Sequence, residues 1–231
     1  MTEALSLMYG IDSPARSLVN IPAEQDRTLF LVGTLSLKQQ ENQICLLEVD
    51  DDWLQITKRS FPHRAGEIWH MSSSPVDPEI VATCYVSYHP LVLVLRTGFL
   101  TAVIYYPSYK RAEFHPGGNK AAIAVGRSIH FADVTSSLKS KTPISALTWN
   151  PHTNGNTVAV AFDDSVKGID TRSLEDAFCI VRANSPRVRN LDFNPNVQHI
   201  MATCGDDCRV ALWDLRKTNE PLKVLQDHTH W

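Results

Sequence analysis

The chain has 231 residues, of which 43% are hydrophobic and 20% charged, and its 22 basic and 25 acidic side chains give a formal net charge of −3. This apolar content with nearly balanced charge excludes a disordered tail, a collagen-like rod and a protein that coats nucleic acid. The 5 cysteines are widely scattered and there is no Asn-x-Ser/Thr acceptor, so we expect a reducing compartment. We also expect no export signal, because no basic stretch precedes the apolar residues of the amino terminus.

The first predicted elements are three short strands rich in β-branched and aromatic residues. They cover Phe30–Leu35, Gln43–Asp50 and Gln55–Ser60. We assign them to one antiparallel unit, and His63 stands before the next unit.

An atypical apolar segment, residues 86–109, comes next. As a helix, its central part Leu91–Tyr106 would reach only about 24 Å against roughly 30 Å of membrane hydrocarbon, and it would carry Arg96 inside. Its β-branched and aromatic residues instead predict two buried strands separated at Arg96–Gly98. No Trp-Asp pair is recognisable in this segment, so neither predicted strand can be assigned as the one that carries the Trp-Asp signature of this blade.

A repeat is the most informative feature of the chain. Residues Ser74–Cys84 align without a gap on Asn194–Cys204, with 5 identical positions in 11. The same pattern of a turn proline followed by a short strand occurs four times, at Pro75, Pro116, Pro151 and Pro195. These prolines are separated by 41, 35 and 44 residues. This spacing is close to the roughly 40 to 45 residues of a four-stranded propeller blade, and it does not fit paired amphipathic helices.

The last unit shows the strand order most clearly. Its four predicted strands are Val188–Phe193, Ile200–Cys204, Arg209–Asp214 and Lys223–Leu225. The Trp-Asp signature of a WD40 blade lies here, and its predicted structural network comprises Thr203, Asp207, Trp213 and Asp214. The histidine of that network is missing, because Ala183–Pro186 stands at its position. Two other blades replace the tryptophan by Ala132 and Ile169, so we expect them to depend on packing alone.

Several motifs in order carry a resemblance to a known family. They are His63–His70, Ala82–Tyr85, Gly168–Ser173, Leu191–Asn196 and Cys204–Cys208. Together they resemble the WD40 proteins that interact with the endosome-associated recycling protein (EARP) and Golgi-associated retrograde protein (GARP) complexes. The resemblance covers roughly residues 24–85 and 110–231 and implies an all-β WD40 β-propeller as a single domain, 1–231. About five blades are accounted for against seven in the family, so we expect a fragment or alternative product that is incomplete at its carboxyl end.

The resemblance also implies a function. It predicts a non-enzymatic, cytoplasmic scaffold that binds vesicle-tethering complexes in endosomal recycling, endosome-to-Golgi retrograde traffic and dense-core vesicle maturation. Such a protein would act peripherally at the trans-Golgi network and endosomes, without a cofactor. The candidate protein contacts are Glu67, Trp69 and His70, because the family motif is denser there than blade architecture requires.

A rival function comes from the box Trp213–Arg216. It resembles the WDxR motif by which WD40 substrate receptors dock on the cullin-4 ubiquitin-ligase adaptor, and it would make Arg216 an exposed contact. Arginine at this position also forms local ion pairs in WD blades, and we favour that interpretation.

Other chemistry is weakly supported. No nucleophile elbow, phosphate loop or zinc-protease motif occurs, so no enzyme activity is predicted. Cys204 and Cys208 with nearby His199 could suggest zinc, but we interpret them as residues flanking a hairpin. Asp clusters at strand ends are interpreted as turn residues, and we expect no nucleic-acid binding from an acidic chain with one small arginine cluster.

Overall fold

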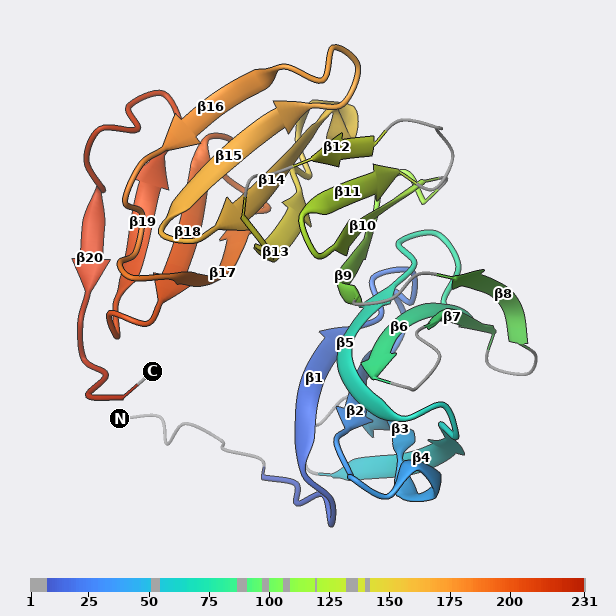
Figure 1. Cartoon of the computed structure of the whole chain (residues 1–231). Coiled ribbons are helices and arrows are strands. Elements are labelled where there is room, and N and C mark those ends of the chain that lie inside the picture. Colours follow the sequence, from blue (N-terminus) through green and yellow to red (C-terminus); the bar gives the residue numbers. More distant parts are fainter. Residues whose placement is uncertain are drawn as a thin grey trace. The chain divides into compact units, whose positions relative to one another are not determined.

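The computed structural model (Figure 1) describes residues 8–50, 55–86, 91–96, 100–105, 109–118, 120–131, 137–139 and 142–230. At residues 86, 91–96, 100–105, 109–110 and 137–139 the description covers the backbone only. The chain groups into two compact units, Met1–Ala112 and Glu113–Trp231. The single domain over residues 1–231 stays a prediction.

The unit Met1–Ala112 contains two four-stranded sheets whose strands lie in chain order. The first sheet consists of β1 (Ala15–Asn20), β2 (Thr28–Thr34), β3 (Gln43–Val49) and β4 (Ile56–Pro62), with the 3-10 turn η1 (Gln39–Glu41) between β2 and β3. The second consists of β5 (Glu67–Ser73), β6 (Ile80–Val86), β7 (Leu91–Arg96) and β8 (Leu100–Tyr105). All pairings within both sheets are antiparallel.

The remaining twelve strands form three more four-stranded sheets, again in chain order. They are β9 (Tyr109–Phe114), β10 (Ala121–Val125), β11 (Ser128–Phe131) and β12 (Ser137–Lys139); β13 (Ile144–Trp149), β14 (Thr157–Phe162), β15 (Ser165–Asp170) and β16 (Asp176–Ile180); and β17 (Val188–Phe193), β18 (Ile200–Gly205), β19 (Val210–Asp214) and β20 (Lys223–Leu225). A second 3-10 turn, η2 (Thr153–Gly155), precedes β14. The prediction of an all-β chain with about five four-stranded blades is confirmed.

The strands predicted before residue 62 correspond to β2, β3 and β4, but sequence reasoning missed β1. Its alternation is weak, since both Arg16 and Leu18 are exposed and only Ser17 is buried. β1 nevertheless pairs with β2, from Ala15 opposite Thr34 onward.

The apolar segment forms the two predicted strands, β7 and β8, with residues 97–99 between them. Burial of their side chains lies outside the described residues. Leu95 pairs with Val81, just as Trp213 pairs with Met201 in the last sheet. The third strand of this blade is therefore present and carries leucine at the tryptophan position, which is why the signature could not reveal it. In the described part of the chain, no helix is long and apolar enough to cross a membrane.

Both units have their cores between neighbouring sheets. In the unit Met1–Ala112, Leu31 and Ile44 pack with Ile68 and Met71 of β5, all four buried. The sheets approach closely here, since a Cβ added to Gly33 would lie 2.6 Å from Ile68 Cγ2.

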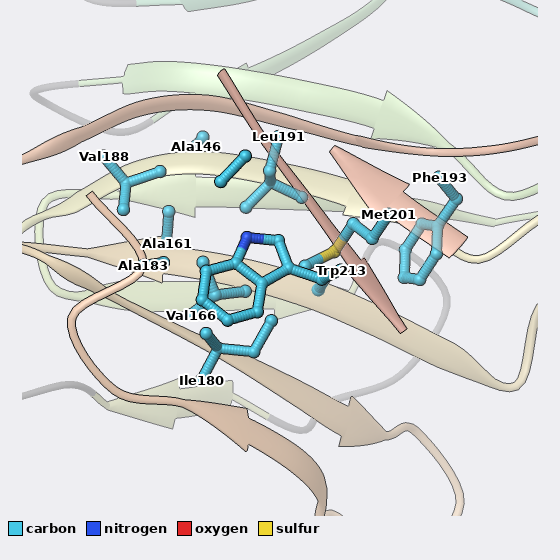
Figure 2. Packing of buried hydrophobic residues seen from close by; sticks show 12 residues of the cluster. Ala146, Ala161, Val166, Ile180, Ala183, Val188, Leu191, Phe193, Met201 and Trp213 are labelled. Atoms are coloured by element: carbon cyan, nitrogen blue, oxygen red, sulfur yellow. The ribbon is translucent and has the colours of Figure 1, made fainter. Parts of the chain in front are cut away.

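In the unit Glu113–Trp231, the sheet β13–β16 packs against the sheet β17–β20. Figure 2 shows Trp213 of β19 beside Met201, Val166 and Ile180, the last two from the opposing sheet. A second cluster joins β10 and β11 to β13–β15 through Ile129, Leu147 and neighbouring apolar residues. Apolar packing between sheets thus holds each blade in place.

Candidate functional site

The predicted polar network of the last blade is present as two separate hydrogen-bonded pairs. Trp213 Nε1 donates to Thr203 Oγ1 at 2.9 Å, and both side chains are almost fully buried. The Asp207 carboxylate instead accepts from Asn184 Nδ2, at 3.0 Å to Oδ1 and 3.3 Å to Oδ2. The Trp213–Thr203 bond joins β19 to β18, and the Asn184–Asp207 bond ties the β18–β19 turn to the segment before β17.

Asn184 occupies the position at which the sequence lacks the network histidine. Its side chain is 1% exposed, and Nδ2 also donates to the Arg209 carbonyl oxygen at 3.2 Å. Its Oδ1 is buried without a hydrogen-bond partner among the described residues. Asparagine is shorter than histidine, so Asn184 holds the turn at Asp207 but does not connect that turn to Thr203. The structure thus places Trp213 with Thr203 and Asp207 with Asn184, and sequence reasoning did not assign Asn184 a role.

The histidine–threonine contact that the last blade lacks is present at the sheet β5–β8, between His63, which precedes β5, and Thr83 of β6. His63 is 2% exposed, and its ring nitrogens lie 3.2 Å from Thr83 Oγ1 and 3.1 Å from the Gly66 carbonyl oxygen. Burial lowers the pKa of the His63 imidazole. His63 thereby fixes the connection that leads from β4 into β5.

Trp69 is the most conspicuous surface feature of β5. It sits at a register shift between Ile68 and His70, where the bulge turns an additional side chain outward, and it is 39% exposed. Trp69 Nε1 donates to Glu67 Oε2 at 3.2 Å, so two of the predicted contact residues lie together. His70 is half-buried in the ladder, opposite Cys84.

A third residue, Arg16, completes this cluster and was not predicted. It stands at the equivalent bulge of β1, between Ala15 and Ser17, and its guanidinium carbon lies 4.1 Å from the Trp69 ring centroid. This is a cation–π contact between residues of two different sheets. The sequence does not predict this contact, because it forms where the bulge of β1 meets the bulge of β5, and the two residues are 53 positions apart in the chain.

The same bulge recurs in the unit Glu113–Trp231, at Ser145 of β13 and Arg189 of β17. Unlike Arg16, which contacts an aromatic ring, Arg189 forms an ion pair with Asp206 in the β18–β19 turn. The first strands β1, β5, β13 and β17 thus each carry one additional residue at a bulge, and among the described contacts two such residues, Arg16 and Trp69, meet in the unit Met1–Ala112.

The Trp213–Arg216 box ends in a local ion pair. Arg216 Nε lies 2.9 Å from Asp214 Oδ1, and Arg216 Nη2 lies 2.6 Å from Asp214 Oδ2. These bonds hold the pKa of the Asp214 carboxyl well below its ordinary value. The Arg216 side chain remains 68% exposed and the Asp214 side chain is 10% exposed. The geometry agrees with local ion pairing.

The cysteines are free thiols, and Cys204 and Cys208 lie at either side of the β18–β19 turn. Within the described residues, no group of three or more His, Cys, Asp and Glu side chains is placed to hold a metal ion.

Comparison with known proteins gives a consistent result. The chain is 34% identical over 282 residues to the EARP and GARP complex-interacting protein 1 of Rattus norvegicus, covering 100% of this chain and 71% of that protein. It is 30% identical over 252 residues to EARP-interacting protein 1 of Caenorhabditis elegans, covering 97% of this chain and 69% of that protein. A WD repeat-containing protein DWA2 of Arabidopsis thaliana is 30% identical over 258 residues, covering 96% of this chain and 70% of that protein. No family model matches the chain.

Proposed function

Because the chain belongs to the family of EARP- and GARP-interacting WD-repeat proteins, we propose that it is a non-enzymatic scaffold that binds the EARP and GARP vesicle-tethering complexes. The observation that carries this proposal is the 34% identity over the whole length of the chain to relatives named for that interaction. In this role the chain supports endosomal recycling, endosome-to-Golgi retrograde traffic and dense-core vesicle maturation. It acts from the cytoplasm, peripherally at the trans-Golgi network and endosomes, and its attachment to membranes depends on the tether.

Rigid surface features support a binding role. The connection from β2 to β3 is tied by Asn42, whose Oδ1 accepts from the Ser36 N–H at 2.7 Å and whose Nδ2 donates to the Ser36 carbonyl at 2.8 Å. Gln39 Nε2 donates to the Arg64 carbonyl at 2.9 Å and so links this connection to the one before β5. Loops held in one conformation lose little entropy on binding, and this favours affinity.

The candidate contact is the surface around Trp69 and Glu67. Tryptophan and arginine are the residue types that most often dominate binding energy in protein interfaces. Trp69 Nε1 donates to Glu67, and the Arg16 guanidinium carbon lies 4.1 Å from the Trp69 ring centroid, so two contacts restrict the orientation of the exposed ring.

The test is a binding measurement with purified EARP and GARP complexes and the full chain as immobilised bait. We expect both complexes to be retained, and Trp69→Ala to weaken their retention about tenfold. Leu222→Ala is the matched control, because Leu222 is 60% exposed in the other unit and should change nothing. Failure of the unaltered chain to retain either complex would overturn the proposal.

The cullin-4 adaptor is the second candidate partner, through Trp213–Arg216. The 68% exposure of Arg216 favours it, whereas the ion pair to Asp214 offers a structural reason for the same residue. Affinity purification with an Arg216→Ala variant separates the two interpretations.

A further inference from the structure

We propose that Arg16, held in place by Trp69, is a receptor for a carboxylate, so that the tether subunit which binds this chain presents an acidic side chain to the start of β1 and β5. The inference rests on the proposed function and specifies the chemistry of the partner. The relevant residues are Arg16, Trp69, Glu67 and Arg64, all in the unit Met1–Ala112.

The Arg16 side chain is preorganised by its contact with Trp69. It is exposed, yet its guanidinium carbon lies 4.1 Å from the Trp69 ring centroid. The ring itself is oriented by its 3.2 Å hydrogen bond to Glu67. An exposed arginine normally loses considerable rotamer entropy when it binds, and stacking on a fixed ring reduces that loss.

The Arg16 guanidinium has no ion-pair partner among the described residues. Four other described arginines form an ion pair with a carboxylate, and they are Arg27, Arg172, Arg189 and Arg216. Arg16 forms no ion pair within the described part of the chain, and Asp12, four residues earlier, is not within salt-bridge distance of it. A guanidinium stacked through its face keeps its N–H donors in the plane, where a carboxylate can bind with two parallel hydrogen bonds.

A second arginine without an ion pair in the described part of the chain stands in the connection before β5. Arg64, in the connection that Gln39 ties down, is exposed and also has no carboxylate partner among the described residues. Glu41 is paired with Lys38 at 2.8 Å, whereas Glu67 accepts from the neutral Trp69 indole and keeps its negative charge, as Asp12 does. The net charge around the pair is therefore balanced. An acidic partner is selected by Arg16 itself, because a guanidinium without an ion pair can bind a carboxylate with two parallel hydrogen bonds.

A protein partner fits better than an anionic membrane. Binding to a lipid surface relies on clusters of several lysines and arginines, whereas here two separate arginines lie in a chain of net charge −3. The half-exposed Trp69 ring next to Arg16 instead offers one apolar and one charged contact, which is suited to an acidic residue beside an apolar one.

The experiment measures binding of purified EARP complex to the full chain and to four variants. Arg16→Ala should weaken binding about tenfold, and Arg16→Glu should weaken it further because two like charges then face each other. Arg16→Lys should lie between wild type and Arg16→Ala, since the charge remains but the planar fork is lost. Arg172→Ala is the matched control, because the Arg172 side chain is 70% exposed and is already paired with Asp170, and it should bind as wild type does.

A second readout identifies the partner group directly. A carbodiimide joins a lysine amine to a carboxylate with loss of water, and it leaves no spacer, so the Arg16→Lys variant should become cross-linked to an Asp or Glu of one tether subunit. The Arg172→Lys variant should give no such product. Mass spectrometry of the cross-linked peptides names the acidic residue.

The outcomes separate the two proposals. If the unaltered chain binds the complex and Arg16→Glu binds equally well, the carboxylate receptor is wrong while the proposed function stands. If the unaltered chain does not bind the complex, the proposed function is wrong and this inference falls with it. Binding of the chain to phosphatidylserine vesicles that Arg16→Glu abolishes, with tether binding unchanged, would also overturn the inference.

Discussion

The hydrogen bond between Trp213 and Thr203 offers the sharpest test of how the last blade is held together. Trp213→Phe removes the indole N–H that donates to Thr203 Oγ1 at 2.9 Å, and Thr203→Val removes the acceptor with little change of shape. Trp213 is 3% exposed and Thr203 is 1% exposed, so water cannot replace the lost partner in either variant.

The magnitude follows from burial. An unsatisfied buried polar group costs about 1–3 kcal/mol, which is the expected loss of unfolding free energy for Thr203→Val. Trp213→Phe should cost about 2–4 kcal/mol, because the smaller ring also leaves a gap beside Met201 and Ile180. In the double variant neither polar atom remains, so its loss should fall short of the sum of the single losses by about 1–2 kcal/mol.

Hydrogen exchange of the β18 and β19 amides, followed by mass spectrometry of the full chain, measures these free energies where the bond lies. Trp69→Phe is the matched control, since it also removes an indole N–H bonded to a side-chain oxygen, but at a site that is 39% exposed. It should cost about 0.5 kcal/mol or less. Strict additivity in the double variant, or equal losses for Trp213→Phe and Trp69→Phe, would refute the reasoning.

Three further predictions concern other parts of the fold. Gly205→Ala should destabilise the last sheet by about 1–3 kcal/mol in the same exchange assay, because its Cβ would lie 2.4 Å from both the Arg187 carbonyl oxygen and Asn184 Cβ; wild-type protection would contradict this. Burial lowers the folded-state pKa of His63, so the stability that the neutral imidazole contributes is fully present above about pH 6.5 and is lost as the pH falls from there through the lowered pKa. Urea unfolding between pH 8 and 5 should show this decrease in the free energy of unfolding, and His63→Gln should flatten it. Arg216→Ala should leave the recovered partners unchanged in affinity purification, because Arg216 pairs with Asp214; selective loss of the cullin-4 adaptor would support the rival function instead.

Some features of this protein could be predicted from its residues alone because they are periodic and local. Proline-led turns and short β-branched strands recur at blade spacing, and the aligned segments Ser74–Cys84 and Asn194–Cys204 hold β6 and β18 in matching registers. The apolar segment could be assigned to β7 and β8 from composition, without any signature residue. Glu67 and Trp69 were singled out because the family motif is dense there, and their role as protein contacts stays a prediction.

Tertiary structure alone decided which residues act together. Asn184 ties the turn at Asp207, although the sequence showed only that the network histidine is replaced by Ala183–Pro186. Arg16 meets Trp69 only because matching bulges in β1 and β5 turn both side chains outward at one edge of the packed sheets. The physical reason is that turn residues and the alternation of a strand can be read along the chain, whereas contacts between blades depend on how two sheets pack, and a linear pattern does not encode that geometry.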